Sequence, residues 1–272
     1  MPTDQAPLPL LLDPAPLKPL LKWPGGKRWL LPHLSPIWDR FRERRLVEPM
    51  AGGLAVTLGL GPRRALVNDI NVHVINLYQQ VRDGLAFHRA WENDEAFYYA
   101  ARAEFNALIR AGRSNTPQAA ELLFYLNRTG YNGLCRFNNT GEYNVPFGRY
   151  KTVNYGRDLQ EHRAAFQAWS FTSGDFEAIE LTASDFVYAD PPYDVEFTKY
   201  AKQDFTWVDQ IRLAEWLARH AGPVVLSNQA TPRVVELYGR LRFDMRFLDG
   251  PRRISCTGDR APAREVLATR GL

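Results

Sequence analysis

The sequence is poor in the residues that build disulfide scaffolds and the common metal sites. Its 272 residues include two cysteines, Cys135 and Cys256, which lie far apart and outside any CxxC pair. Neither a disulfide framework nor a zinc site is therefore expected. The five histidines show no HExxH or other ligand spacing, and we expect no metal. We interpret both cysteines as small packing residues.

Long apolar runs and a strong charge of one sign are also missing. The longest uncharged stretch near the middle of the chain, residues 49–62, is too short to span a membrane and contains glycine and proline. The apolar run at residues 8–12 has no basic region before it and is interrupted by prolines, which argues against a signal peptide. We expect a cytoplasmic protein. The net charge of +4 permits nucleic-acid binding without demonstrating it.

Short apolar segments alternate with longer stretches of helical spacing. Strands are predicted at 46–48, 65–69, 186–190 and 223–228, and helices at 72–81, 94–109, 117–127 and 208–220. This alternation is typical of βαβ units around a parallel sheet. Ligands bind beyond the carboxyl ends of such strands. The acids at three of these ends, Glu48, Asp69 and Asp190, are therefore candidates for one common site.

Two parts of the chain depart from this alternation. Six of the 19 prolines fall in the first 20 residues, which predicts an extended arm over residues 1–18. Residues 124–157 contain eight aromatic residues, six asparagines and five Lys or Arg against one acid, Glu142. No helical or strand period fits this segment, and its Gly, Asn and Pro residues indicate turns. Because its charge equals the net charge of the chain, the remainder is nearly neutral.

A glycine loop follows the first predicted strand and includes Gly52 and Gly53. Glycines at a strand-to-helix turn let the backbone approach a ligand. Asp69, at the end of the next strand, can accept hydrogen bonds from two ribose hydroxyls. The pair favours a nucleoside cofactor, although a tight turn with a helix cap explains the same residues. A P-loop is excluded because no Gly-Lys-Ser/Thr follows.

The tetrapeptide Asp190-Pro191-Pro192-Tyr193 stands at the end of an apolar strand. Its prolines have no N–H group, so Asp190 and the nearby carbonyls form a cluster of acceptors. Such a cluster suits an exocyclic amine, and Tyr193 offers a flat face to a ring. This predicts a site for an amino-purine or amino-pyrimidine. The alternative is a proline-terminated strand with a capping aspartate.

A third motif, LKWPGGK at residues 21–27, places Lys22 and Lys27 on either side of Trp23 and a glycine pair. Lys27 would lie near the start of a helix, where an anionic group is favoured. A solvated loop with a packed tryptophan explains the motif equally well.

In combination these motifs resemble the Dam-type (alpha-group) DNA adenine-N6 methyltransferases, which use S-adenosylmethionine. The resemblance extends from about residue 20 to the carboxyl terminus. It depends on LKWPGGK (21–27), VEPMAGGLAV (47–56), NDIN (68–71), LNRTGYNGLCRFNNTGEYNVPFGRYK (126–151), GDF (174–176), DPPY (190–193) and RRIS (252–255). The block at 126–151 is the most diagnostic and is similar to the family's target-recognition segment.

The resemblance implies an α/β fold: a Rossmann-like S-adenosylmethionine-dependent methyltransferase sheet with an inserted, mainly helical and loop target-recognition domain. The catalytic domain would comprise residues 19–71 and 158–272, and the recognition domain residues 72–157. The implied activity is site-specific methylation of N6 of adenine in duplex DNA, commonly in GATC, with the base flipped into the DPPY pocket. The family further suggests a monomer.

The resemblance also assigns roles to individual residues. The cofactor-binding positions are Trp23, Lys27, Glu48, Gly52, Asp69, Asp175, Phe176 and Asp190. The catalytic positions are Asp190, Pro191, Pro192 and Tyr193. The DNA-binding positions are Lys22, Tyr131, Asn132, Leu134, Arg136 and Tyr150, among which Arg136 would read a guanine.

The glycine loop departs from the family pattern. The family has Phe-x-Gly-x-Gly where this chain has Met50-Ala51-Gly52-Gly53-Leu54. Met50 can replace an aromatic residue in apolar packing. Leu54 introduces a side chain where the backbone nears the cofactor, and Gly53 is expected to take over the tight turn.

The residues predict a mechanism without a covalent nucleophile. Asp190 and the Pro191 carbonyl would accept hydrogen bonds from both N–H groups of the amine and free its lone pair. Methylation of a cytosine carbon requires a cysteine, typically in a Pro-Cys pair. The chain has no such pair, because Cys135 follows Leu134 and Cys256 follows Ser255. A methyltransferase acting on cytosine N4 or an RNA base remains an alternative, as does a catalytically silent DNA-binding protein. Arg252 and Arg253 either line the DNA channel or belong to a solvated face.

Overall fold

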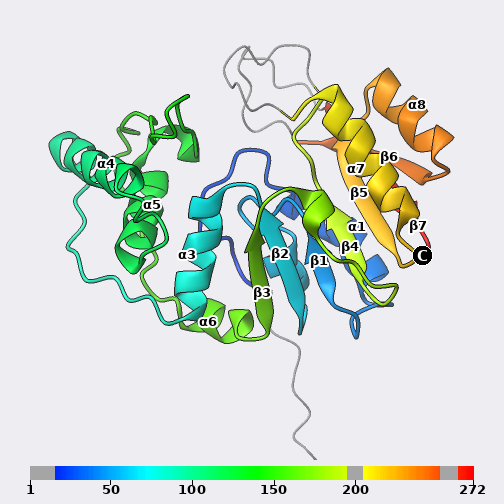
Figure 1. Ribbon diagram of the computed structural model, residues 1–272, viewed down its shortest axis with the longest axis horizontal. Helices are drawn as coiled ribbons and strands as arrows, with labels where there is room; N and C mark the ends of the chain where they lie inside the picture. The colour runs from blue at the N-terminus through cyan, green and yellow to red at the C-terminus, as the bar shows by residue number, and fades with distance from the viewer. Residues whose placement is uncertain (1–15, 195–204, 252–262) are drawn as a thin grey trace, which may run out of the picture.

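The computed structural model describes residues 16–194, 205–251 and 263–272. Most of the predicted amino-terminal arm lies outside the described residues, as do Arg252, Arg253 and Cys256. Figure 1 shows a central sheet with helices on both faces and a helical lobe beside one of its edges.

Seven strands form one sheet in the order β3-β2-β1-β4-β5-β7-β6. Neighbouring strands are parallel except at β7, which runs antiparallel to β5 and β6. The chain order reverses between β1 and β4, which is where open α/β sheets bind ligands. The strands are β1 (Leu46–Glu48), β2 (Ala65–Asp69), β3 (Trp169–Ser173), β4 (Phe186–Ala189), β5 (Val224–Gln229), β6 (Asp244–Gly250) and β7 (Ala263–Arg270).

Alternate residues of the central strands face two separate hydrophobic cores. Val187 and Val224 pack with helices α7 (Trp207–Arg219) and α8 (Pro232–Arg240), beside the short η3 (Phe176–Ala178). Phe186 and Val225 pack with η1 (Arg28–Leu30) and α1 (Leu31–Trp38) on the other face. Successive side chains of a strand point to opposite faces, so burial of both faces explains these nearly continuous apolar runs.

A third core joins the β2–β3 edge of the sheet to the inserted helices. It contains Tyr78, Phe105 and Phe124, from three different helices, together with Val67 of β2. The elements around it are α2 (Thr57–Leu60), α3 (Val72–Arg82), α4 (Glu95–Arg110), α5 (Pro117–Thr129), η2 (Tyr131–Gly133) and α6 (Gln160–Phe166). Helix α3 contacts both the sheet and α5. The domain boundary at residue 72 stays a prediction, at the start of a helix that belongs to both parts.

The inserted helices begin where their side chains cap them. Asn71, Asp94 and Thr116 each accept a hydrogen bond from a backbone N–H in the first turn of α3, α4 and α5. Side-chain acceptors at this position satisfy donors that have no partner within the helix.

The predicted α/β architecture is confirmed, and most element bounds agree within two residues. The helix predicted at 117–127 is observed as α5 and ends at Thr129, so residues 124–129 of the segment 124–157, in which no helical period was recognised, are helical. All of these residues except Arg128 are buried.

Candidate active site

Three acids lie at the carboxyl ends of neighbouring strands. Glu48 ends β1, Asp69 ends β2, and Asp190 directly follows β4. Because β1 pairs in parallel with both β2 and β4, all three reach the same edge of the sheet. The structure therefore brings together the acids that the sequence pattern grouped.

Glu48 is the most deeply buried of these acids. Its side chain accepts a hydrogen bond from the hydroxyl of Thr57, and the residue is 3% exposed. Burial, with repulsion from Asp190 and Asp69, raises the pKa of Glu48 to about 8 against the opposing effect of Thr57. The carboxyl is therefore largely protonated at neutral pH.

Asp69 links the end of β2 to the glycine loop. Its Oδ2 accepts a hydrogen bond from the Gly52 N–H at 2.8 Å, and its Oδ1 accepts one from the Asn71 N–H at 2.8 Å. Burial raises the pKa of Asp69, and both hydrogen bonds oppose that rise. The neighbouring Asn68 donates to the carbonyls of Pro49 and Gly174, both at 3.0 Å. The loops after three strands are thus held in one arrangement.

Trp23 packs directly against the glycine loop. A Cβ atom on Gly52 would lie 2.6 Å from Trp23 Nε1, and one on Gly53 would lie 2.6 Å from Trp23 Cβ. No real side chain fits at either position. In this structure the two glycines therefore allow the indole to approach the loop.

The tight turn of the loop spans Ala51 to Leu54: the Leu54 N–H donates to the Ala51 carbonyl at 2.8 Å, with Gly52 and Gly53 in the middle of the turn. Gly53 therefore takes part in the turn, as expected, and Leu54 ends it. Leu54 has a φ of +56°, in the left-handed region, whereas Gly53 lies outside it. Leu54 adopts this costly conformation with its side chain fully buried in the core shared with α3. Its side chain accordingly points into that core, away from the edge where the acids meet.

Lys27 forms an ion pair with Asp190 inside the protein. Its Nζ donates to Asp190 Oδ1 at 2.8 Å and lies 4.0 Å from Glu265 Oε2, while Ser227 Oγ donates to the same Oδ1 at 2.8 Å. Burial alone lowers the pKa of Lys27, but Asp190, Tyr193 and Glu265 raise it well above its ordinary value. The ammonium group keeps its proton and orients the Asp190 carboxylate.

The turn after β4 is fixed by side chains from α7 and from the far strands. Gln210, which is 2% exposed, donates through Nε2 to the Pro192 carbonyl at 2.7 Å and accepts from Asn228 Nδ2 at 3.0 Å. The Tyr193 hydroxyl donates to Glu265 of β7. Lys27 Nζ lies 4.4 Å from the centroid of the Tyr193 ring. Pro191 is buried between these contacts.

Asp175 and Phe176 lie after β3, on the same edge of the sheet. Asp175 is exposed and accepts hydrogen bonds from Arg212 of α7 at 3.1 and 3.2 Å. Phe176 is buried, and its ring centroid lies 5.6 Å from that of Trp216. The structure thus holds Phe176 in the core beside α7, with Asp175 at the surface above it.

Lys22 and Tyr150 contact each other beside the predicted recognition turn. Lys22 Nζ donates to the Arg128 carbonyl at 2.7 Å and lies 3.8 Å from the centroid of the Tyr150 ring. Burial, and the charge of Arg128, lower the pKa of Lys22. Both residues are already engaged within the protein.

The tip of this turn is open to solvent. Tyr131 is 50% exposed, and Asn132 is exposed with a φ of +52°. Leu134 is half-buried against the third core. The exposed Arg136 donates through Nε to Asn144 Oδ1 at 2.8 Å and through Nη2 to the Asn144 carbonyl at 3.3 Å.

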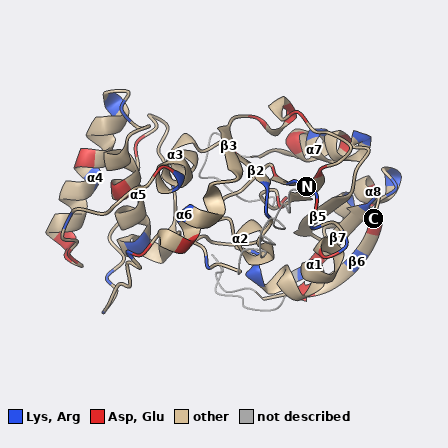
Figure 2. Ribbon diagram, turned by 90° about the horizontal axis from the view of Figure 1, so that it is seen from below, with Lys and Arg blue, Asp and Glu red and all other residues tan. Residues whose placement is uncertain are grey.

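Basic charge in the recognition segment is partly balanced by neighbouring acids. Figure 2 shows both signs interspersed over α4 and α5. Glu142 accepts a hydrogen bond from Arg110, and Arg149 lies 3.6 Å from Glu95. Lys151 is exposed.

Cys135 and His73 lie between the Asp69 loop and the recognition segment. Asn71 Nδ2 donates to Cys135 Sγ at 3.6 Å, and burial together with Asp69 raises the pKa of the thiol to about 12. The His73 ring stacks on Phe137 at 4.7 Å, and burial lowers its pKa to about 4. The thiol stays protonated, as a packing residue requires.

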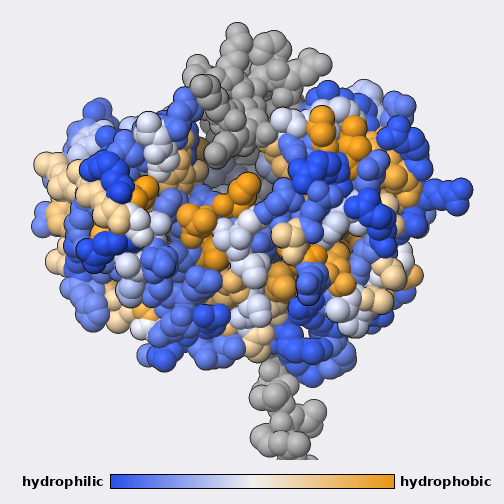
Figure 3. Space-filling model, viewed as in Figure 1, coloured by the Kyte–Doolittle hydropathy of each residue, from blue (hydrophilic) through white to orange (hydrophobic). Residues whose placement is uncertain are grey.

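The sequence patterns missed several residues of this site. Ser227 and Glu265 contact Asp190 and Tyr193, and Gln210 holds the turn. Ile70, 76% exposed beside Asp69, adds an apolar side chain at the rim. Figure 3 shows hydrophobic side chains at the surface near the carboxyl ends of the strands. The available signals were an acid inside an apolar strand at Glu265 and a polar strand end at Ser227.

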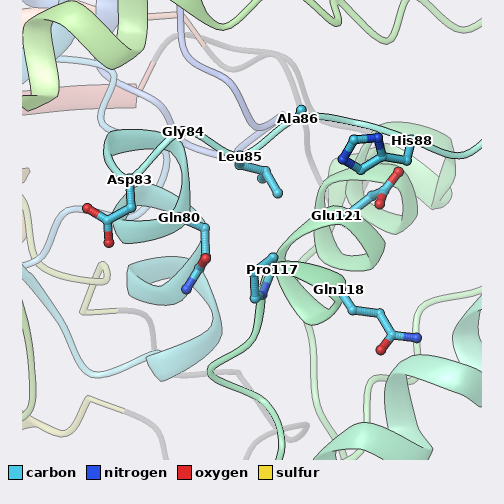
Figure 4. Close-up of a pocket in the computed structure, with 9 residues that line it drawn as sticks. All are labelled: Gln80, Asp83, Gly84, Leu85, Ala86, His88, Pro117, Gln118 and Glu121. Carbon is cyan, nitrogen blue, oxygen red and sulfur yellow. The ribbon is translucent and has the colours of Figure 1, made fainter.

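A surface pocket of about 360 Å³ lies away from this site, between α3 and α5 (Figure 4). Its lining includes Asp83, His88 and Glu121, and none of the predicted site residues. Within the described ranges, no group of three or more His, Cys, Asp or Glu side chains is arranged to hold a metal ion. Among the same residues, no helix is both long enough and apolar enough to cross a membrane.

Comparison with known families identifies the arrangement. Residues 23–246 match the model of the D12 class of N6 adenine-specific DNA methyltransferases. The chain belongs to this family. The resemblance to Dam-type enzymes is thereby confirmed, and S-adenosylmethionine is the methyl donor that a methyltransferase of this fold implies.

Several known methylases are similar to this chain over most of its length. The DNA adenine methylase of Escherichia coli strain K12 is 36% identical over 82% of this chain and 84% of its own. The retron Ec67 DNA adenine methylase of Escherichia coli is 33% identical over 93% of this chain and 91% of its own. The type II methyltransferase M1.LlaDCHI of Lactococcus lactis subsp. cremoris is 34% identical over 82% of this chain and 84% of its own.

Proposed function

We propose that this D12 methyltransferase transfers a methyl group from S-adenosylmethionine to N6 of adenine within GATC in duplex DNA. The target base would be flipped into a pocket formed by Asp190, Pro191, Pro192 and Tyr193. The observation that supports this most directly is the fixed Asp190 carboxylate. Among the described residues, both hydrogen bonds to it go to Oδ1. Oδ2 is therefore the acceptor for the amine.

The charges at the strand ends fit a cationic cofactor. Glu48, Asp69 and Asp190 meet at one edge of the sheet, and burial, with smaller contributions from the two aspartates, raises the pKa of Glu48. S-adenosylmethionine supplies an electrophilic methyl group on a positively charged sulfur. Asp69 would hold its ribose, and Trp23, Lys27, Glu48 and Gly52 would form the rest of the pocket, with Asp175 and Phe176 beside its adenine.

The DPPY turn provides acceptors and a flat surface. Asp190 and the Pro191 carbonyl accept hydrogen bonds from the two N–H groups of the amine, which makes the nitrogen lone pair available. Preorganised acceptors stabilise the positive charge that develops on nitrogen. Gln210 keeps the turn in place through Pro192. Tyr193, oriented by its hydrogen bond to Glu265, stacks on the flipped ring.

A duplex base reaches this pocket only by leaving the stack, at a cost of a few kcal/mol. Tyr131 and Asn132, both exposed at the turn tip, and Leu134 would fill the gap. Arg136 would make a bidentate contact to guanine, exchanging its bonds to Asn144 for bonds to the base. Lys22 and Tyr150 would border the DNA as a packed pair. We further propose that the protein acts as a monomer, in the cytoplasm.

Replacing Asp190 tests the proposal. Asp190→Ala should abolish methylation of plasmid DNA by labelled S-adenosylmethionine while duplex binding is largely kept. Sequencing that detects methylated adenine would locate the wild-type products. A matched control is Asp185→Ala, because Asp185 is also buried but pairs with Arg45 at the opposite end of β4. Turnover by Asp190→Ala would contradict the role given to Asp190. Wild-type products outside GATC would contradict the proposed sequence specificity.

A further inference from the structure

Asn127 has every polar atom of its side chain engaged in joining distant segments. It lies near the end of α5 and is fully buried. Its Oδ1 accepts the Lys22 N–H at 2.8 Å, and its Nδ2 donates to the carbonyls of Lys22 at 2.9 Å and of Gly133 at 3.0 Å. One amide therefore pairs with both backbone groups of Lys22 and with the recognition turn.

Lys22 also presses on the recognition turn through its side chain. A Cβ atom on Gly133 would overlap the Cβ atom of Lys22. Gly133 has a φ of +64°, and it closes the η2 turn that presents Tyr131 and Asn132. A shift of this turn toward Lys22 must therefore displace that residue.

The next residue in the chain, Trp23, packs on the glycine loop. Its indole fills the space in which Gly52 and Gly53 would carry Cβ atoms. Gly52 in turn donates its N–H to Asp69. A continuous set of contacts thus connects the recognition turn, Asn127, Lys22, Trp23 and the Asp69 loop.

We propose that Asn127 is a positioning residue that couples DNA binding at the recognition turn to cofactor binding at the Gly52–Asp69 loop. The inference rests on the proposed function, which assigns those two ligands to the two ends. A buried amide whose donors and acceptors are all used resists displacement, because each broken bond leaves a buried polar group without a partner. Such coupling is reciprocal: each ligand tightens the other by the same factor.

The first test measures that factor by calorimetry. The probe is S-adenosylhomocysteine, which has no methyl group to transfer, with and without a GATC duplex. We expect the duplex to tighten binding in the wild type by a factor in the ordinary range of about 5–150. In Asn127→Ala the factor should fall to about one, as the reciprocal link is cut. Asn76→Ala is the control, because Asn76 is also buried but donates to the carbonyl of Thr116, in another loop.

The second test uses two glycines of the same segment and does not depend on a folded Asn127 variant. Gly133→Ala should weaken S-adenosylhomocysteine binding at least about fivefold even without DNA, the lower end of ordinary couplings. Gly141→Ala should leave it unchanged. Gly141 also has a positive φ, of +79°, but a Cβ atom there would meet nothing within 4 Å.

The outcomes separate this inference from the proposed function. A wild-type factor of one, an unchanged factor in Asn127→Ala, or equal losses in Asn127→Ala and Asn76→Ala would overturn the coupling. Equal effects of the two glycine substitutions would also overturn it. Each of these results leaves the proposed function standing, because the wild type still binds both ligands. A wild type that binds neither ligand would remove both proposals.

Discussion

At Leu54 a single residue combines a strained backbone with a fully buried side chain. Leu54→Ala should cost about 2–5 kcal/mol through the lost packing. Leu54→Gly should cost about 1 kcal/mol less, because glycine adopts the φ of +56° without the left-handed penalty. Urea unfolding midpoints would measure both.

The control for this comparison is Leu77, which is fully buried in the regular helix α3. At Leu77 the order of stability should reverse: the glycine variant should be less stable than the alanine variant by about 1 kcal/mol. The same order at both positions would contradict the strain assigned to Leu54.

Glu48 makes stability depend on pH in a defined direction. Its pKa rises on folding from an ordinary 4.5 to about 8, so the folded state binds its proton more tightly. The contribution of this tighter proton binding to the free energy of unfolding is fully present below pH 4.5 and is lost as the pH rises to about 8. Thermal unfolding of Glu48→Gln, compared with the wild type at several pH values, should show the variant gaining relative stability across that window. Parallel curves would show that Glu48 ionises normally in the fold.

At the scale of elements, α7 acts as a support for the DPPY turn. Gln210→Ala removes the donor to the Pro192 carbonyl. We expect kcat to fall by about 10–100-fold, because small misplacements of catalytic groups have effects of that size. The cofactor dissociation constant should change little. Steady-state kinetics and calorimetry would measure the two quantities.

A matched control for Gln210→Ala is Gln79→Ala. Gln79 of α3 likewise donates from a helix to a backbone carbonyl, that of Phe171 in β3, at 3.1 Å. Its loss should leave kcat within about twofold, because it does not touch the catalytic turn. Equal decreases in kcat for Gln210→Ala and Gln79→Ala would mean that a general loss of stability, and not the contact from α7, affects the catalytic turn.

Element scale is also where the sequence patterns succeeded and failed most clearly. The strands at 46–48 and 65–69 were predicted with their observed ends, because each is a short apolar run closed by an acid. The helix predicted at 117–127 is observed with two further residues. The edge strands β3 and β6 were not predicted, because most of their residues are exposed and no apolar run marks them.

At the scale of the whole molecule, DNA binding should depend on salt through the exposed cations of the recognition segment. Lys151→Ala should weaken binding to all duplexes alike and reduce the slope of log affinity against log salt by about one. Arg240→Ala is the control, because Arg240 is exposed at the end of α8, on the far side of the sheet from the inserted helices. Fluorescence anisotropy at several salt concentrations would measure both slopes. An unchanged slope in Lys151→Ala would place that residue outside the interface.

The sequence by itself determined the strand ends, the order of the motifs and the family. These depend on local apolar patterns and on short motifs that are legible along the chain. Only the tertiary structure decided that Lys27 pairs with Asp190, that Trp23 covers the glycine loop and that Glu265 holds Tyr193. The residues of these pairs are separated by 29 to 163 positions, and only the tertiary fold brings them into contact. The physical reason is that burial selects partners for polar groups in space, and no local pattern encodes which distant group will be near.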